Sequence, residues 1–176
     1  GQGAADGQSS DDGGADLGCA PWTAATRFTT PMRFAELASS SAEAQPRLSS
    51  DGLTIYFSSL RAGWDIYIAD RSARDQPFSN VRLLAPVNST ANDVGFAPSE
   101  DQLSGYLSSA RGGNSDLWIS QRAKVSAAWG TPVRLVPTST AFIDYHPSQS
   151  RDGLTLYFVI EQWDQGVGGT DLVVAT

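Results

Sequence analysis

Short apolar runs, separated by turn-forming residues, follow one another along most of the chain. In one stretch of roughly fifty residues they lie near Val81–Leu84, Val94–Pro98, Leu103–Ser109 and Asp116–Arg122. Their length and their β-branched and aromatic residues are typical of strands. The run Leu53–Phe57 is almost continuously apolar, as expected of a strand that is covered on both faces. The pattern therefore predicts an all-β protein built from short strands.

The same order of runs occurs three times, in copies that span about residues 28–77, 78–128 and 129–176. In each copy an aspartate precedes the most apolar run: Asp51, Asp101 and Asp152. Gly52 and Gly153 follow two of these aspartates, and Asp-Gly favours a tight hairpin turn because glycine adopts a positive φ. Four strands in a unit of roughly 40–50 residues are the signature of a β-propeller blade. The repeat predicts a β-propeller of four-stranded antiparallel blades, three of them in this chain.

A resemblance to a known family rests on the strings around the turn aspartates. In the first copy, Pro46–Phe57 is followed by Ser-Ser-x-Arg-x-Gly and then by Asp-Ile-Tyr. Over residues 28–176 this pattern resembles the TolB-type, WD-repeat-like propeller repeat and related repeats of bacterial envelope proteins. The resemblance implies a periplasmic or extracellular binding scaffold, and some members are appendages to hydrolases. Two positions depart from it: Gln102, where the family prefers glycine, and Gln162, where it prefers arginine.

The composition narrows the range of partners. The 176 residues carry 12 Lys+Arg and 19 Asp+Glu, which gives a net charge of −7. A surface of this sign repels phosphate backbones and anionic lipids, so neither nucleic acid nor a membrane surface is an expected partner. No apolar run approaches the roughly 18 residues of a membrane span. With Cys19 and His146 as its single cysteine and histidine, the chain lacks the ligands of a typical zinc site, and we expect no metal or cofactor.

The first part of the chain differs in composition from the rest. Residues 1–20 contain four aspartates, many small residues and no basic residue. This predicts a flexible leader before three blades in residues 21–176. The run Met32–Leu37 matches the strand type of Val81–Leu84, and the chain ends on a predicted strand at Asp171–Ala175. We therefore expect the first strand to lie beside the last one.

Three blades are fewer than the roughly four to eight that close a propeller ring. One hypothesis is a homodimer in which two chains complete a six-bladed ring, because unpaired edge strands promote association. The other hypothesis is that the three blades are a piece of a larger propeller. The sequence leaves both open.

The connections between strands alternate between two faces of a blade, because neighbouring strands are antiparallel. Connections between second and third strands share one face with the connections between successive blades, and ligand sites often form on such loops. This face supplies the candidate ligand-binding residues Arg61, Trp64, Asn92, Asp93, Arg111, Asn114, Asp144, Tyr145 and Trp163. An exposed Trp64 or Trp163 would stack on a sugar or anchor a protein. The alternative is that each tryptophan covers a blade edge.

Asp144, His146 and Ser148 stand at alternate positions of one predicted strand and invite comparison with a Ser-His-Asp triad. Along an extended strand, however, the three groups are strung out rather than convergent, and no catalytic residue is predicted. The acid at position 144 recurs in the other copies as Glu43 and Asp93. We interpret the recurring acids as acceptors of loop N–H groups, with nearby arginines as braces.

The leading functional hypothesis is a non-enzymatic propeller that binds a protein or cell-envelope partner through its loop face. The second is a lectin-like, carbohydrate-binding propeller or the accessory module of a glycan-acting hydrolase. The third is a hydrolase with a site at the centre of the ring. Binding to glycans would favour the second hypothesis, and binding to one protein partner would favour the first.

Overall fold

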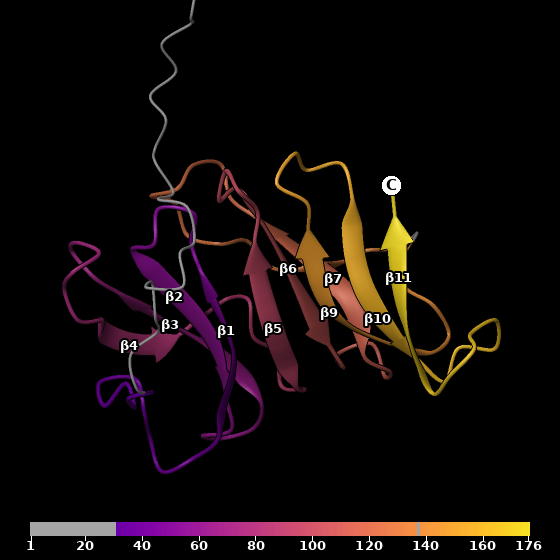
Figure 1. The fold of residues 1–176 in the computed structure, drawn as a ribbon, viewed down its shortest axis with the longest axis horizontal. Coiled ribbons are helices and arrows are strands. Elements are labelled where there is room, and N and C mark those ends of the chain that lie inside the picture. The colour runs from indigo at the N-terminus through magenta and orange to yellow at the C-terminus, as the bar shows by residue number, and fades with distance from the viewer. Residues whose placement is uncertain (1–30, 137) are drawn as a thin grey trace, which may run out of the picture. The chain divides into compact units, whose positions relative to one another are not determined.

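The strands predicted from the repeat are present. The computed structural model describes residues 31–136 and 138–176, so the predicted leader at residues 1–20 lies outside the described part. The chain forms two units, residues 1–33 and 34–176, and every described strand belongs to the second. Within the described residues, eleven strands form three antiparallel sheets, drawn in Figure 1 from indigo to yellow in chain order.

Each sheet is built from strands that are consecutive in the chain. The first sheet has the order β1 (Glu43–Leu48), β2 (Thr54–Ser59), β3 (Asp65–Asp70) and β4 (Ser79–Leu83). The second has the order β5 (Asp93–Pro98), β6 (Ser104–Ser109), β7 (Asp116–Gln121) and β8 (Val133–Arg134). The third contains β9 (Ile143–Gln149), β10 (Leu156–Glu161) and β11 (Thr170–Ala175), with β10 in the middle. The predicted all-β fold with four-stranded antiparallel blades is confirmed, and the third sheet has three strands among the described residues.

The range Met32–Leu37, expected to be the first strand, contains no strand: irregular backbone is followed by a turn. In this turn the Leu37 N–H donates to the Phe34 carbonyl, just as the Val87 N–H donates to the Leu84 carbonyl after β4. This segment therefore forms a turn, and its Leu37 packs on the apolar cluster of the first sheet. Its apolar spacing is not that of a strand. The expectation that a strand at this place lies beside the last strand is wrong for the same reason.

The hairpin between the first two strands of each sheet is closed by the same serine–aspartate turn. In the first sheet the Ser49 hydroxyl donates to Asp51 Oδ1 at 2.6 Å, and the Leu53 N–H donates to the same oxygen at 2.9 Å. Both bonds recur in the second and third sheets. Gly52 has the predicted positive φ of 72°, and Gln102 takes φ 60° at the equivalent position. The turn is stabilised so well by its aspartate that it accepts a residue other than glycine.

Apolar side chains fill the space between successive sheets. Tyr56 of β2 packs against Phe96 of β5, with ring centroids 4.9 Å apart, and against Trp129, with centroids 6.4 Å apart. Between the second and third sheets, Tyr106 of β6 clusters with Leu156 and Phe158 of β10. Trp129 is buried in this contact. The sheets thus pack face to face through one repeated tyrosine position.

Arginine side chains cover aromatic rings at two repeated places. Arg111 lies over Trp118 at 5.0 Å, and Arg61 lies over Tyr67 at 4.7 Å in the equivalent loop of the first sheet. On the other loops, Arg122 lies over Trp129 at 4.2 Å; Arg71 lies over Phe78 in the same way. The planar guanidinium suits this stacking better than an ammonium group does.

Candidate functional site

A hollow of about 530 Å³ opens where the inner ends of the three sheets meet. Its residues come from the β2–β3, β4–β5 and β6–β7 connections and from the adjoining strand ends, which is the loop face predicted to bind ligands. They are Ala44, Gln45, Trp64, Asn92, Val94, Ala110, Ser115, Ile143, Tyr145, His146 and Glu161. We call this hollow the inner hollow. It brings together Trp64, Asn92 and Tyr145 of the predicted site.

In each sheet, the strand that comes first in the chain (β1, β5 or β9) has one irregular residue near the inner hollow. Gln45, Gly95 and His146 occupy equivalent repeat positions, and all three have a positive φ, of 53°, 71° and 55°. The strand pairing shifts at this point in β1 and in β5. Such a bulge turns a side chain away from the alternation of a regular strand. The bulge is the reason that Gln45 and His146 reach the hollow.

Serine hydroxyls of the preceding sheet hold two of these bulges. The Gly95 N–H donates to Ser58 Oγ at 3.0 Å, and the His146 N–H donates to Ser108 Oγ at 3.1 Å. Ser58 and Ser108 are equivalent residues of the middle strands β2 and β6. One repeated hydrogen bond therefore joins the first sheet to the second and the second to the third.

Gln45 and His146 contact each other above Gly95. The Ser58 hydroxyl donates to Gln45 Oε1 at 2.8 Å, so the amide nitrogen faces His146 Nε2, 2.6 Å away. Because an amide nitrogen only donates, this His146 nitrogen is the acceptor and the imidazole is neutral. Burial lowers the pKa of His146, and the nearby Arg47 lowers it further. The first and third sheets are thus bridged by a neutral amide–imidazole pair.

Aromatic side chains form the walls of the inner hollow. Trp64 is half-buried, and its backbone is tied to the next connection: its carbonyl accepts the Asp93 N–H at 2.7 Å. The Tyr145 ring meets the His146 ring edge to face, with centroids 4.7 Å apart. Asn92 is exposed, so its amide is accessible to a ligand. The hollow therefore offers aromatic surface, amide groups and one carboxylate, that of Glu161.

Two of the predicted site residues form a buried ion pair instead of lining the hollow. Arg111 Nη2 lies 2.5 Å from Asp93 Oδ1, and it also donates to the Val87 carbonyl at 2.6 Å. The other Asp93 oxygen accepts the Ser89 N–H at 2.6 Å and the Ser89 hydroxyl at 2.8 Å. These contacts agree with the interpretation of the recurring acid as an acceptor of loop N–H groups braced by arginine.

The corresponding acid of the third sheet has a different environment. Asp144 is fully buried and accepts the Thr140 N–H at 2.6 Å and the Thr140 hydroxyl at 2.9 Å. The repeat position of Arg111 is held by Gln162, which makes no ion pair. Burial raises the pKa of Asp144, and the carboxylate of Asp116 contributes in the same direction. Asp144 therefore acts as a loop brace rather than as a ligand contact.

The remaining predicted residues lie apart from the inner hollow. Arg61 donates to the Leu37 carbonyl at 2.9 Å, and Asn114 donates to the Ala141 carbonyl at 3.2 Å. Trp163 packs against the apolar cluster of the third sheet. These contacts join loops to the scaffold. As ligand-binding residues they remain predictions.

The Ser-His-Asp comparison has no counterpart in the geometry. Asp144 is held by Thr140, and His146 is turned by its bulge toward Gln45. No hydrogen bond links Asp144, His146 and Ser148 in the described part of the chain. The same part contains no group of three or more His, Cys, Asp or Glu side chains placed to hold a metal ion.

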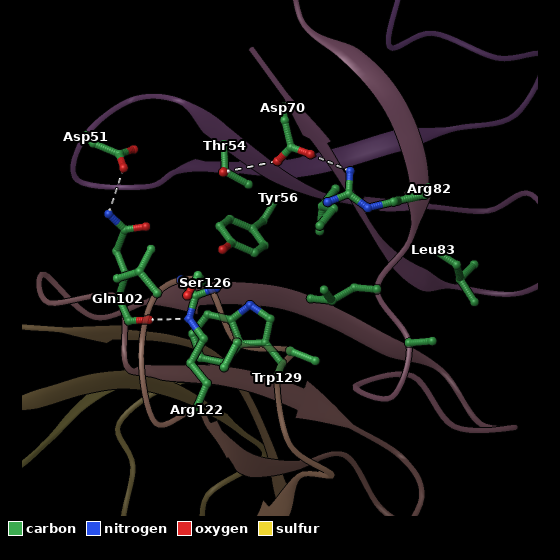
Figure 2. A pocket seen from close by; sticks show the side chains of 16 residues that line it. Asp51, Thr54, Tyr56, Asp70, Arg82, Leu83, Gln102, Arg122, Ser126 and Trp129 are labelled. Atoms are coloured by element: carbon green, nitrogen blue, oxygen red, sulfur yellow. Dashed lines mark hydrogen bonds and ion pairs between the residues drawn. The ribbon is translucent and has the colours of Figure 1, made fainter. Parts of the chain in front are cut away.

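A second hollow, of about 370 Å³, lies between the first and second sheets on the opposite loops. Figure 2 shows Tyr56 and Trp129 within it and two polar pairs at its rim. Asp70 Oδ2 lies 2.5 Å from Arg82, and Gln102 Nε2 donates to Asp51 Oδ2 at 3.1 Å. Arg122 donates to the Gln102 carbonyl and covers Trp129. The Gln102–Asp51 contact joins the second sheet to the first, whereas the Asp70–Arg82 pair lies within the first sheet. The polar groups named here are therefore already paired with other protein groups.

Sequence reasoning did not select Gln45 and His146 as ligand contacts. It assumed regular alternation along the inner strands, whereas the bulges redirect these two side chains. The available signal was the alignment of Gln45, Gly95 and His146, because a glycine in the middle copy indicates an unusual backbone and a need for space.

Comparison with known proteins identifies the fold. No family model matches the chain, and no curated protein matches it. A TolB candidate from Agrobacterium tumefaciens is 22% identical with a TM-score of 0.53, over 72% of this chain and 43% of that protein. TolB from Acinetobacter baumannii is 17% identical with a TM-score of 0.52, over 74% and 29%. The fold is that of TolB β-propeller blades.

The chain spans less than half the length of either TolB structure. Over the three sheets, the match to the TolB structures supports the resemblance noted in the sequence. In the part of the chain that the structure describes, no helix is long and apolar enough to cross a membrane.

Proposed function

We propose that the three sheets form a non-enzymatic scaffold of the bacterial periplasm that binds a protein partner in the inner hollow. The observation that carries the proposal is the meeting of Trp64 and Asn92, from two separate connections, with Tyr145 of β9 around one concave surface. Aromatic side chains that are partly buried in a concave site are the typical anchors of protein interfaces. The TolB-like fold supports the assignment to an envelope scaffold.

The chemistry of the inner hollow favours binding over catalysis. His146 is neutral and engaged by Gln45, and the recurring acids Asp93 and Asp144 are held inside the scaffold. What remains accessible is aromatic surface, the Asn92 amide and the Glu161 carboxylate. Together with the net charge of −7, this favours a partner segment that is neutral or basic and contains apolar side chains.

A selection from a phage-displayed library of random linear peptides tests this proposal. The immobilised protein should enrich peptides with apolar and basic residues. Trp64→Ala should raise the dissociation constant of an enriched peptide by roughly 30-fold. Tyr145→Ala should have a similar effect. Val133→Ala is the matched control, because Val133 is an exposed apolar residue of β8 outside the hollow. Peptides that bind all four proteins equally well would place the site elsewhere.

Carbohydrate binding is the second candidate, favoured by the partly exposed Trp64 ring beside the Asn92 amide. Stacking on aromatic faces and amide hydrogen bonds suit sugar rings. Trp163, the other tryptophan considered for this role, packs into the third sheet and does not join the hollow. Binding to a glycan array that disappears in Trp64→Ala, with no enriched peptide, would select this candidate over the first.

A further inference from the structure

A chain of hydrogen bonds runs across the inner hollow and joins all three sheets. The Gly95 N–H donates to Ser58 Oγ, and the Ser58 hydroxyl donates to Gln45 Oε1. The Gln45 amide nitrogen donates to His146 Nε2, and the His146 N–H donates to Ser108 Oγ. The two bonds in the middle of the chain therefore depend on how the Gln45 side-chain amide is oriented.

The Gln45 amide can take two orientations between these partners. In the one described above, its oxygen accepts from the Ser58 hydroxyl and its nitrogen donates to the neutral imidazole of His146. When the amide turns over, its oxygen faces His146 Nε2 and its nitrogen faces Ser58 Oγ. A hydroxyl oxygen has two lone pairs, so Ser58 Oγ can accept this amide as well as the Gly95 N–H. The second orientation suits an imidazolium, in which both ring nitrogens donate.

The second orientation has a cost, and this cost favours the first at neutral pH. Ser58 is fully buried, and its hydroxyl hydrogen loses Gln45 Oε1 as its acceptor when the amide turns over. A buried donor without an acceptor is unfavourable. The lowered pKa of His146 has the same direction, because burial and Arg47 also favour the neutral ring. Part of the His146 side chain is exposed, so a proton can reach the ring from the solvent.

We propose that Gln45 and His146 form a pH-dependent switch in the inner hollow. When His146 Nε2 takes up a proton from the solvent, the Gln45 amide turns over and its oxygen accepts a hydrogen bond from the imidazolium. The bridge between the first and third sheets is kept, while the hollow gains one positive charge. Both residues stand at bulges with a positive φ, which hold their side chains toward each other in either state.

The charged groups on the elements around His146 leave this new charge without an ion pair among the described residues. Arg47 of β1 has the same sign as the imidazolium, and the serines of β2 and β6 are uncharged. Glu161 of β10 is the carboxylate that lines the inner hollow. The other carboxylates have partners of their own: Glu43 of β1 has Arg61, Asp93 of β5 has Arg111, Asp116 of β7 has Arg134, and Asp144 of β9 has Thr140.

NMR spectra of the imidazole test the switch directly, because His146 is the single histidine of the chain. At about pH 8, where the ring is neutral, long-range proton–nitrogen spectra should place its hydrogen on Nδ1. The side-chain amide signals of Gln45 should then shift together with the ring signals, at the pKa of His146 below 6.5. A neutral ring with its hydrogen on Nε2 would overturn the proposal, as would Gln45 amide signals that do not follow the titration.

Gln45→Glu locks the arrangement that we assign to acid. A carboxylate accepts hydrogen bonds from both Ser58 and the imidazolium, so this variant should raise the pKa of His146 above 6.5. Gln121→Glu is the matched control: it adds the same charge at the exposed end of β7, away from the inner hollow, and should leave the pKa of His146 unchanged. Circular dichroism verifies that both variants are folded. The same pKa of His146 in both variants would show that Gln45 does not contact the ring.

The switch also predicts how pH regulates binding, and this part rests on the proposed function. A basic partner segment should be repelled by the charged hollow. A peptide enriched in the selection described above should therefore bind roughly 10-fold more weakly at about pH 5 than at about pH 7.5. His146→Gln cannot take up the proton and should lose most of this difference, which separates His146 from carboxylates that titrate nearby.

The two measurements fail in different ways. If no peptide is enriched, the proposed function fails, and the NMR titration still decides whether the switch exists. If a peptide binds equally well at both pH values to the unchanged protein, the regulation of binding by His146 is overturned while the binding site stands.

Discussion

The second and third sheets carry equivalent aspartates that are buried to the same degree but have different partners. Asp93 contacts the guanidinium of Arg111 and the Ser89 turn, whereas Asp144 has the Thr140 turn and Gln162 at the arginine position. The second sheet also lies between two others, while one face of the third is exposed. The comparison shows that the turn hydrogen bonds suffice to place the acid, and that the arginine adds the charge partner.

The largest expected effect comes from removing that charge partner. Arg111→Ala leaves the fully buried Asp93 carboxylate without its arginine, and we expect the free energy of unfolding to fall by about 3–5 kcal/mol. The matched change in the third sheet, Gln162→Ala, should lower it by less than about 1 kcal/mol. Urea unfolding of both variants measures the difference. Equal losses would mean that the ion pair is not what distinguishes the two sheets.

The next effect concerns the tyrosine position between sheets. Tyr106→Ala should lower the free energy of unfolding by roughly 3 kcal/mol, because the ring fills the space against the third sheet. Gln149 also donates to its hydroxyl at 2.8 Å. Tyr157→Ala, at the exposed equivalent, should lower it by less than about 1 kcal/mol in the monomer. Chemical denaturation at low protein concentration compares them, and a large loss at Tyr157 would contradict the exposed face.

A smaller effect tests how the second sheet fills its core. Where the other sheets have a proline and a large aliphatic residue, the second has Phe96 and Gly105, and a Cβ on Gly105 would overlap the Phe96 ring. Gly105→Ala should therefore lower the free energy of unfolding by about 1–3 kcal/mol. Combining it with Phe96→Leu should recover part of the loss in the same unfolding measurement. An additive double variant would show that the two residues do not share one space.

The smallest effect is a difference in pH dependence between two aspartates. Burial raises the folded-state pKa of Asp144 above its ordinary value of 3.8, so the folded chain holds this proton more tightly than the unfolded chain does. The stability contributed by Asp144 should therefore fall as the pH rises from about 3.8 through the raised pKa. Asp144→Asn should remove this slope from unfolding curves measured at several pH values.

Asp101 should behave in the opposite way. The Ser99 hydroxyl and the Leu103 N–H lower the pKa of Asp101 below 3.8. Its contribution to stability is then present above that value and is lost as the pH falls through the lowered pKa. Asp101→Asn should lower the free energy of unfolding near neutral pH and leave it equal to that of the unchanged protein in acid. The same sign of slope for both aspartates would contradict the environments described here.

Much of the fold could be predicted from the sequence because its determinants are local. The serine–aspartate turns and the apolar middle strands recur at a fixed spacing, and even Gln102 keeps the turn that Gly52 makes. The prediction of a strand at Met32–Leu37 is wrong because apolar residues at this spacing suit a strand as well as a turn that packs on a sheet. Only contact with a neighbouring sheet distinguishes the two structures.

The candidate site was harder to predict, for a related reason. Trp64 and Asn92 could be predicted because they lie on loops of one face, and Tyr145 could because it stands near the start of β9 on the same face. Gln45 and His146 were missed as ligand contacts because the bulges that redirect them depend on serines of the preceding sheet. Arg111 and Asp93 were predicted to bind ligand, but they form an ion pair with each other. Their positions on loops do not reveal this pairing.

The stacking of arginines on aromatic rings has a practical consequence for handling the protein. Four of the eleven arginines stack on aromatic rings, and Lys124 is the single lysine among the twelve basic residues. Lys124 is exposed in the β7–β8 connection, on the loops opposite the inner hollow. Amine-directed labels and surface-coupling reagents have this one side chain to react with, besides the terminal amine. A protein tethered through Lys124 would turn its inner hollow toward the solution.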